Sequence, residues 1–506
     1  MAPNDAEIAP GPAAFAAAYE AGEGVVAWVR TVADLETPVA AFMKLAAGKP
    51  NSFLLESIEG GAARGRYSVI GLAPDLIWRC RGGVAEVNRH ALSAPFAFVA
   101  EDRPALESLR ALIAESRLTL PPELPPMAAG LVGYLGYDLV RLMERLPDKN
   151  IDTLALPEAL LLRPTLLAIF DNVRDELILA APVWLQPDVP AQQAYARAQA
   201  RLEEAREALN RPLPHAAPPV TLPAPGTPKS NFTPEGFQAA VLRAKEYIAA
   251  GDAFQIVPSQ RFSIPFALPP FALYRALRRI NPAPFLFFLD FGGFAVVGSS
   301  PEILVRLRDG IVTIRPLAGT RPRGATPEED RALEADLLAD PKERAEHLML
   351  LDLGRNDVGR VAEIGSVQVT ESFAIERFSH VMHISSNVQG RARADVDALD
   401  ALIAGFPAGT LTGAPKIRAM EIIEELEPER RGIYAGCIGY FAANGTMDTC
   451  IGLRTAVVKD GVMYVQAGCG VVADSDPAKE EEETRQKARA LVRAAEEAVR
   501  FAGTGR

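Results

Sequence analysis

Short apolar runs that favour β-strands occur in clusters along this chain of 506 residues, and helical segments separate the clusters. In a fold built on a parallel sheet, strands and helices alternate one by one, because each parallel strand needs a crossover connection. Here the runs over residues 285–291, 294–300 and 310–319 follow one another with only turns between them. The clustering therefore predicts an α+β fold with mostly antiparallel β-sheets.

A proline-rich segment divides the chain into two unequal parts. Seven prolines lie between Pro212 and Pro228, and proline has no amide hydrogen to donate within a helix or a central strand. Such a segment is a semi-rigid linker. We expect an N-terminal domain over residues 1–211, a linker over residues 212–230 and a second domain over residues 231–506.

The composition excludes several classes of protein. The net charge of −11 at pH 7 argues against nucleic acid and anionic membranes as main partners. No apolar run reaches the roughly 18 residues that a membrane span needs, and the N-terminus lacks the basic region of a signal peptide. The cysteines contain no CxxC pattern, so we expect reduced thiols in a cytoplasmic protein. They are Cys80, Cys437, Cys450 and Cys469.

Two pairs of glutamates, each at the start of a predicted helix, are the strongest indication of chemistry. Each pair follows an Asp-Pro step, and Asp is a good N-cap while proline suits the first helical position. Residues three apart share one face of a helix, so each pair can present two carboxylates to one place. Converging pairs would surround a hard cation, most plausibly Mg²⁺. The pairs are Glu343 with Glu346, after Asp340-Pro341, and Glu480 with Glu483, after Asp476-Pro477.

Both pairs also have a purely structural interpretation. Glu343 could close a capping box with Asp340. Glu480 and Glu483 could form a solvated acidic face near a helix N-terminus, where negative charge is favoured. The spacing alone does not exclude this, and the neighbouring sequence decides in favour of chemistry.

Seven short sequence motifs in the second half of the chain decide between these two interpretations. They are SSPE at residues 299–302, PLAGTR at 316–321, HLMLLDLGRND at 347–357, PAGTLTGAPK at 407–416, YAG at 434–436, GLRT at 452–455 and QAGCGVV at 466–472. Together and in this order, they resemble the chorismate-utilising enzyme family, and within it the branch that forms anthranilate. The resemblance covers the chain from about Val25 onward. It implies two large sheets packed face to face as a sandwich, with helices outside and the site in the second half.

The resemblance also implies a set of binding residues. Chorismate is a dianion, and a metal held by Glu346 and Glu483, with Glu343 and Glu480 in support, would stabilise charge that shifts during the reaction. Mg²⁺ is the implied cofactor. The glycine-rich turn could instead be a strand bend, and Lys487 could be only an i,i+4 partner of Glu483. The implied substrate-binding residues are Gly319, Thr320, Tyr434, Arg454, Gly468, Cys469, Gly470 and Lys487.

Proton chemistry requires an acid for the departing C4 hydroxyl of chorismate, and the resemblance assigns this role to Glu302. A carboxyl with a raised pKa suits such a role. His347 is implied in the later elimination or in orienting the transition state, although a lone histidine on an apolar helix face is usually a core residue. Thr410 and Lys416 are expected to order the site.

Two positions indicate which reaction of the family takes place. Family members that add water at C2 have a lysine where this chain has Gln255, and most aminodeoxychorismate synthases have a nucleophilic lysine where it has Ala318. Direct attack by ammonia is therefore expected, giving anthranilate and pyruvate. None of the cysteines has the setting of a glutaminase nucleophile, so a separate glutamine amidotransferase subunit should supply the ammonia.

A tryptophan site is also implied by the resemblance. The string at residues 54–57 (LLES) and the string at residues 281–286 (NPAPFL) match the family's feedback elements, so we expect inhibition by L-tryptophan. The second string lacks hydroxyls that are usual in the family. Two alternative functions stay open, an aminodeoxychorismate synthase component I and a non-catalytic tryptophan-sensing relative. The expected tryptophan-binding residues are Leu55, Glu56, Ser57, Pro284, Phe285 and Leu286.

Overall fold

The computed structural model describes residues 7–46, 48–59, 63–186, 188–213, 226–378 and 380–502, so most of the expected linker lies outside the described residues. The helices are α1 Pro12–Glu20, α2 Pro38–Ala46, α3 Ala105–Glu115, α4 Ala191–Asn210, α5 Pro234–Ala249, α6 Pro270–Ile280, α7 Pro327–Ala339, α8 Pro341–Gly359, α9 Ala398–Gly405, α10 Gly409–Thr412, α11 Lys416–Leu426 and α12 Pro477–Ala502. Short 3₁₀ helices span Pro126–Ala128 and Tyr137–Leu142.

The strands of the first half are β1 Val25–Val32, β2 Ser52–Glu56, β3 Ile58–Glu59, β4 Ala63–Arg64, β5 Tyr67–Arg81, β6 Val84–Asn88, β7 Val99–Ala100, β8 Gly130–Leu135, β9 Ala159–Asp171 and β10 Glu176–Val183. The strands after the proline-rich segment are β11 Lys229–Ser230, β12 Gln255–Ile256, β13 Ser259–Pro265, β14 Phe285–Asp290, β15 Ala295–Ser300, β16 Ile303–Arg308, β17 Ile311–Ile314, β18 Leu317–Pro322, β19 Gln368–Arg377, β20 Val381–Arg391, β21 Gly413–Ala414, β22 Cys437–Ala442, β23 Met447–Ile451, β24 Thr455–Lys459 and β25 Val462–Gly468.

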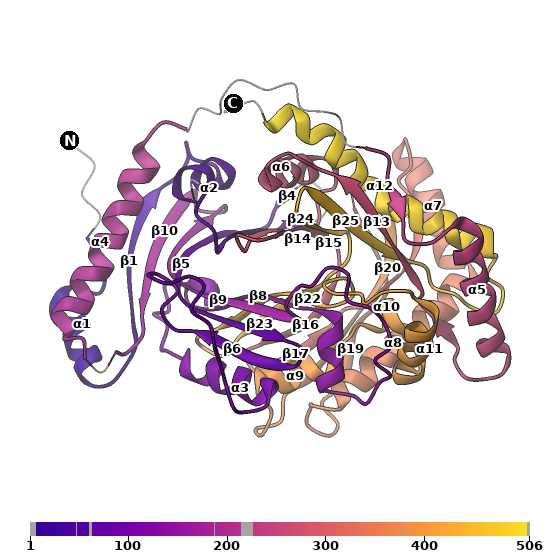
Figure 1. The fold of residues 1–506 in the computed structure, drawn as a ribbon, viewed down its shortest axis with the longest axis horizontal. Coiled ribbons are helices and arrows are strands. Elements are labelled where there is room, and N and C mark those ends of the chain that lie inside the picture. The colour runs from indigo at the N-terminus through magenta and orange to yellow at the C-terminus, as the bar shows by residue number, and fades with distance from the viewer. Residues whose placement is uncertain are drawn as a thin grey trace.

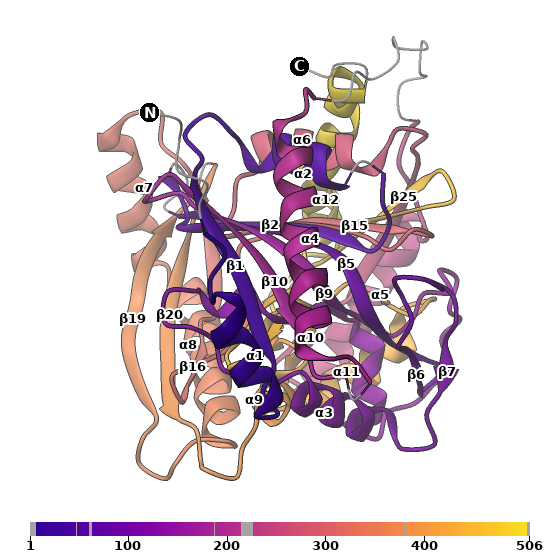
Figure 2. The ribbon, with the colours of Figure 1, turned by 90° about the vertical axis from the view of Figure 1, so that its left-hand side faces the viewer.

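The fold is a mixture of helices and antiparallel β-sheet, as the clustering of strands predicts. Two layers of strands face each other, and the helices lie on their outer sides: α6 and α12 above the upper layer and α3 and α9 below the lower layer (Figure 1). Helix α4 runs beside β1 and β10 (Figure 2). Within the described part of the chain, no helix is long and apolar enough to cross a bilayer.

Two long strands join the layers. Strands β5 and β9 pair with each other along most of their length, with a shift of register between Pro74 and Leu76 and a left-handed backbone at Ala73, whose φ is +50°. On one side of this irregularity β5 pairs with β2 and β9 with β10; on the other side β5 pairs with β6 and β9 with β8. The sandwich therefore forms one hydrogen-bonded network, which contains 21 of the described strands.

Strands from the two halves of the sequence pair directly. Strand β2 of the first half lies between β5 and β14, with Leu286 opposite Glu56. Strand β8 of the first half pairs with β22 of the second half. The boundary expected at the proline-rich segment stays a prediction, and the backbone hydrogen bonds of the two halves are shared across it.

A buried ion pair fixes the loops around the end of α11. The guanidinium of Arg431 bonds both carboxylate oxygens of Glu427 and donates to the carbonyls of Leu411 and Val257. The same carboxylate accepts from the backbone and hydroxyl of Ser259. Only 1% of the Arg431 side chain and 3% of the Glu427 side chain are exposed. Because each charge is fully bonded, removing one partner would leave the other buried and uncompensated.

We predict that Glu427→Gln destabilises the protein by about 3–5 kcal/mol, because it leaves Arg431 buried without a counter-charge. Equilibrium urea unfolding measures this loss. Glu425→Gln is the matched control, since Glu425 lies two residues earlier with a side chain 49% exposed, and exposed pairs contribute less than about 1 kcal/mol. Equal losses in the two variants would contradict the importance of the buried pair.

Candidate active site

The two expected helix starts are present. The Asp340 side chain accepts from the amides of Lys342 and Glu343 at 2.9 and 3.2 Å, which begins α8 at Pro341. The Asp476 side chain accepts from two amides at 3.0 Å, which begins α12 at Pro477. Both glutamate pairs therefore lie near the starts of helices, as predicted, with Glu343 and Glu480 in the first turn and Glu346 and Glu483 in the second.

The four carboxylates interact electrostatically across the two helices. Burial raises the pKa of Glu346, and the negative charges of Glu343 and Glu483 raise it further. Burial and the charge of Glu483 likewise raise the pKa of Glu480. The ammonium of Lys487 bonds Glu483 Oε1 at 2.7 Å and the carbonyl of Gly468 at 2.9 Å. The acidic pairs thus converge, with Lys487 beside them.

The carboxylates near Glu346 are chemically suited to bind a cation. Carboxylate oxygens are the ligands that Mg²⁺ prefers, and the crowding of like charges around Glu346 is what a bound cation would relieve. Among the described residues, however, no three acidic, histidine or cysteine side chains are arranged closely enough to hold a metal ion. Mg²⁺ therefore stays a prediction.

The turn at residues 468–470 lies close to these carboxylates, and two of its three residues are glycines. A Cβ atom at Gly468 would lie 2.7 Å from the carbonyl of Pro258, and one at Gly470 would lie 2.6 Å from the amide nitrogen of Gln255 and 3.5 Å from Glu346. Gln255 donates to Glu346 Oε1 at 2.9 Å. A side chain at Gly468 would meet backbone, and one at Gly470 would press on the Gln255 amide that bonds Glu346, so the two glycines let the turn lie close to Glu346.

Between the two glycines, Cys469 is fully buried. Its backbone amide donates to the carbonyl of Pro258. Burial holds the pKa of its thiol well above the ordinary value. Cys469 therefore contributes the shape of the turn, and its side chain is not a nucleophile.

Glu302 is the buried acid of the site. It follows β15 and is 7% exposed, and burial raises its pKa to about 8. The amide of Leu317 and the hydroxyl of Thr410 donate to the carboxyl at 3.3–3.4 Å, and the charge of Arg454 also favours the anion. Since desolvation outweighs these contacts, Glu302 is protonated at neutral pH.

Arg454 is a cation without a bonded anion. It follows β23 in a left-handed backbone conformation, with φ of +49°. Within the described part of the chain, its guanidinium has no hydrogen-bond or ion-pair partner, and burial lowers its pKa. A desolvated guanidinium of this kind is suited to bind a carboxylate in a bidentate fork. The phenol of Tyr434, which is buried, lies close to the Gly468 turn.

The loop at Gly319 and Thr320 brings a histidine to the site that the sequence analysis did not select. His383 Nδ1 lies 2.8 Å from the carbonyl of Gly319 and 3.1 Å from the Thr320 hydroxyl. Because the carbonyl only accepts, Nδ1 carries the hydrogen and Nε2 is left as an acceptor. Burial, then the charge of Arg454, lowers the pKa of His383 to about 4. Its place opposite the PLAGTR string, in the strand paired with β18, is the signal that could have identified it.

His347, which the sequence analysis preferred, is in a different environment. It is fully buried, its Nε2 lies 2.6 Å from the Ser386 hydroxyl and its ring packs edge-on against Phe373. Burial alone lowers its pKa to about 4. These contacts are with Ser386 of β20 and Phe373 of β19, and burial is the cause of its lowered pKa. Lys416 bonds Asp357 at 2.9 Å, and its role in ordering the site stays a prediction.

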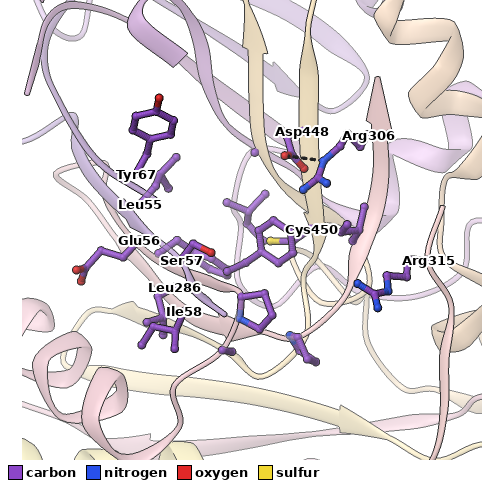
Figure 3. A pocket seen from close by; sticks show the side chains of 18 of the residues that line it. Leu55, Glu56, Ser57, Ile58, Tyr67, Leu286, Arg306, Arg315, Asp448 and Cys450 are labelled. Carbon is purple, nitrogen blue, oxygen red and sulfur yellow. Dashed lines mark hydrogen bonds and ion pairs between the residues drawn. The ribbon is translucent and has the colours of Figure 1, made fainter. Parts of the chain in front are cut away.

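A large cavity lies between the two layers of strands. Its volume is about 770 Å³, and we call it the inter-sheet cavity. Figure 3 shows Leu55, Ser57 and Leu286 along one side and Arg306, Arg315 and Asp448 along the other. All six residues expected to bind tryptophan line this cavity. The structure therefore brings the LLES and NPAPFL strings together, as β2 and β14 are neighbours in the sheet.

Glu56, one of the expected tryptophan-binding residues, already has partners within the protein. Its carboxylate is bonded by Arg278 at 2.6 and 2.9 Å and by the Tyr274 hydroxyl at 2.5 Å. Both partners come from α6. Glu56 is therefore neutralised within the protein and joins α6 to the wall of the cavity.

Comparison with known proteins agrees with this geometry. The family of chorismate binding enzymes matches residues 63–493. Anthranilate synthase component 1 of Cereibacter sphaeroides is 59% identical, over 96% of this chain and 98% of the relative. The Pseudomonas putida protein of the same name is 51% identical, over 92% and 94%. The crystal structure of anthranilate synthase component I from Streptococcus pneumoniae is 36% identical, covers 91% of this chain and 99% of its own, and has a TM-score of 0.75.

The chain therefore belongs to the chorismate binding enzyme family and is a chorismate-utilising enzyme. Within that family, its similarity over nearly the whole length is to the anthranilate synthase component 1 branch.

We predict that the acid Glu302 makes folding pH-dependent. Unfolded, the carboxyl loses its proton near its ordinary pKa of 4.5, whereas in the folded protein it keeps the proton up to about pH 8. The free energy of unfolding should therefore fall as pH rises between these values, by about 3–5 kcal/mol from this group. Glu302→Gln should remove that loss, measured by urea unfolding at pH 5 and pH 8.5. Identical pH dependence in both proteins would contradict the buried, protonated state.

Proposed function

We propose that this enzyme is the aminating lyase subunit of an anthranilate synthase, converting chorismate and ammonia to anthranilate and pyruvate, the first committed step of tryptophan biosynthesis. The observation that carries the proposal is the combination of a buried acid that keeps its proton at neutral pH, Glu302, with a half-buried guanidinium that lacks a bonded anion within the described residues, Arg454. The relatives named anthranilate synthase component 1 support the choice of product.

In the proposed first stage, the ammonia nitrogen bonds to C2 of chorismate as the C4–oxygen bond breaks. Glu302 gives its proton to the departing hydroxyl, which leaves as water. Arg454 holds a substrate carboxylate, with Tyr434 beside it. Thr410 and the amide of Leu317 orient the Glu302 carboxyl and stabilise the carboxylate that forms.

In the proposed second stage, the proton at C2 is removed, the enolpyruvyl ether bond breaks, pyruvate leaves and the ring becomes aromatic. We assign the histidine of this stage to His383 in place of His347. His383 is neutral, its tautomer is fixed by the Gly319 carbonyl, and its Nε2 can accept a proton. Thr320 holds the ring by a contact at 3.1 Å.

The acidic pairs suit a bound Mg²⁺ held by Glu346 and Glu483, with Glu343 and Glu480 in support. When bound, the ion would stabilise negative charge on the ring carboxylate of the substrate. The residues around it have separate tasks: Gln255 orients Glu346 by a hydrogen bond, and the glycine turn lets the substrate carboxylate approach backbone amides.

Ammonia is proposed to come from a separate glutamine amidotransferase subunit in the cytoplasm. A glutaminase nucleophile needs an accessible thiol of lowered pKa. All four cysteines are buried, and burial raises the pKa of each thiol. The name component 1, carried by the relatives, supports a second component.

We further propose that L-tryptophan inhibits the enzyme by binding in the inter-sheet cavity. Leu55, Pro284 and Leu286 provide an apolar wall for an indole, and the hydroxyl of Ser57 provides a polar contact. Because the cavity is formed by strands of both halves, a ligand there would favour one arrangement of them.

For the metal, we predict that Glu346→Gln and Glu483→Gln each lower the rate of anthranilate formation by roughly 100-fold or more, because an electrostatic stabiliser of the transition state is lost. Titration with Mg²⁺ at saturating chorismate measures the effect. Glu482→Gln, on the exposed face of the same helical turn, is the matched control. Near-normal rates in both variants at saturating Mg²⁺ would refute the assignment.

For the nitrogen source, we predict that the purified chain makes anthranilate from chorismate with ammonium salts and not with glutamine. The rate should rise with pH towards the pKa of ammonium, because free NH₃ is the attacking species. Anthranilate fluorescence without any added lyase measures the product and separates it from aminodeoxychorismate. Glutamine-dependent turnover by the chain alone would refute the need for a partner.

For regulation, we predict that tryptophan binds and that Ser57→Ala weakens this binding by roughly 10-fold, the effect of losing one hydrogen bond to a charged group. Uninhibited turnover should change little. Calorimetry with and without chorismate and Mg²⁺ measures affinity in both states, and chorismate should weaken tryptophan binding. Equal affinity in both conditions would remove the allosteric proposal.

A further inference from the structure

A bulge in β18 places two backbone residues against one histidine. Gly319 and Thr320 of β18 lie opposite the single residue His383 of β20, where the register of the two strands shifts. Gly319 has a φ of +67°, a left-handed backbone that glycine adopts without strain. Such bulges re-aim side chains and are frequent beside active sites. We call Gly319 and Thr320 the β18 bulge, and both of them contact Nδ1 of His383, at 2.8 and 3.1 Å.

The residue after the bulge, Arg321, is bonded to three carboxylates. Its Nε donates to Asp336 at 2.7 Å, its Nη2 to Asp340 at 2.9 Å and its Nη1 to Glu343 at 3.2 Å. Its Nη1 also donates to the carbonyl of Thr320 at 3.1 Å. A planar guanidinium can bond several acceptors in fixed directions at once. Arg321 therefore joins the β18 bulge to the end of α7 and to the start of α8.

The three carboxylates have different places in the structure. Asp340 caps α8 with Oδ1 and accepts from Arg321 with Oδ2. Glu343 lies in the first turn of α8, and its Oε2 would lie 3.1 Å from a Cβ atom at Gly319. Asp336 is the outer contact, with a side chain 64% exposed. The guanidinium and the glycine together bring the acidic turn of α8 against the bulge.

We propose that Arg321 is a positioning residue, whose guanidinium holds the β18 bulge on the first turn of α8 and thereby fixes the place and tautomer of His383. Arg321 acts through Gly319 and Thr320, which contact the ring. This inference rests on the proposed function, because His383 is the group that accepts the C2 proton in the proposed second stage.

Loss of the guanidinium should affect the second stage more than the first. The contacts of the acid Glu302 come from Leu317 and Thr410, outside the bulge. His383, by contrast, would lose the acceptor that keeps its hydrogen on Nδ1, and its Nε2 would no longer be a constant acceptor. The aminated intermediate, which still carries its C2 hydrogen and its enolpyruvyl ether, would then leave before pyruvate is eliminated.

The direct test is ¹⁵N NMR of the histidine rings at pH 7, where His383, with a pKa of about 4, is neutral. The chain has five histidines, so labelled histidine gives few signals, and a His383→Gln variant assigns the relevant one. The parent should show one tautomer, with hydrogen on Nδ1, and Arg321→Gln should show the averaged signals of two tautomers. An unchanged His383 tautomer in folded Arg321→Gln would overturn the proposal.

The matched control is Asp336→Asn. It changes only the outer, exposed partner of the same guanidinium and leaves the bonds to Asp340 and Glu343 in place. Its histidine spectrum and its rate of anthranilate formation should both be those of the parent. A His383 tautomer that changed in this variant as it does in Arg321→Gln would contradict the inner contacts as the cause.

The second test measures the products made from chorismate and ammonium. Arg321→Gln should lower kcat for anthranilate by roughly 10–100-fold, the effect of misplacing a reacting group, and should release the aminated, non-aromatic intermediate, separated by chromatography. Arg321→Lys keeps the charge among the three carboxylates, which protects folding, but lacks the planar fork and should release the intermediate too. Urea unfolding compares the stability of each variant with that of the parent.

Three outcomes separate the possibilities. A lower rate without released intermediate would overturn the assignment of Arg321 to the second stage. Parent-like products from Arg321→Lys would show that charge suffices and would overturn the role of the guanidinium. If the parent made no anthranilate from chorismate and ammonium, the proposed function would fail, whereas the NMR result would still decide whether Arg321 fixes His383.

Discussion

The pairing of strands across the two halves of the sequence is the constraint on which the rest of the molecule depends. Buried backbone groups must be hydrogen-bonded, and separating β2 from β14 would leave backbone amides and carbonyls of both strands without partners. The long strands β5 and β9 bend at Pro74 and carry the same hydrogen bonds from one layer to the other. This continuity encloses the inter-sheet cavity and sets its distance from the buried acid Glu302. The cavity is lined by residues of both halves, whereas every residue of the candidate site lies in the second half.

Removing charged groups from water has two opposite outcomes in this protein. At Arg431 and Glu427 each buried charge has a full set of partners, and the result is rigidity at the loops beside the site. At Glu302 and Arg454 the partners are incomplete, so one group keeps its proton and the other lacks a bonded anion within the described residues. Incomplete bonding of this kind destabilises the free protein, and substrate groups can compensate for it. The same physics therefore separates a structural pair from a functional one.

Local features were predictable from the sequence, and long-range ones were not. The caps at Asp340 and Asp476 and the antiparallel strands follow from short-range rules. The sequence places His347 beside Glu346 along the helix, but such proximity does not determine which way a ring faces, and His383 stands out only through its contacts with Gly319 and Thr320. The partners of Glu56 were missed because Arg278 lies 222 positions away in the sequence and meets it only through packing of α6 on β2. The orientation and partners of such side chains depend on tertiary contacts between segments that are far apart in the sequence.

The bonding of Glu56 within the protein changes how ligand recognition in the cavity is understood. A carboxylate bonded on both oxygens by Arg278 and Tyr274 contributes little net charge to a ligand, since its field is largely cancelled locally. Its function is then to hold α6 against β2, which keeps the apolar wall of the cavity in place. Specificity for an amino acid would come from the opposite wall, where charged groups retain unbonded atoms. The apolar and polar walls of the cavity thus come from different layers of the sandwich. The affinity of any ligand that contacts both walls therefore depends on the distance between the two layers.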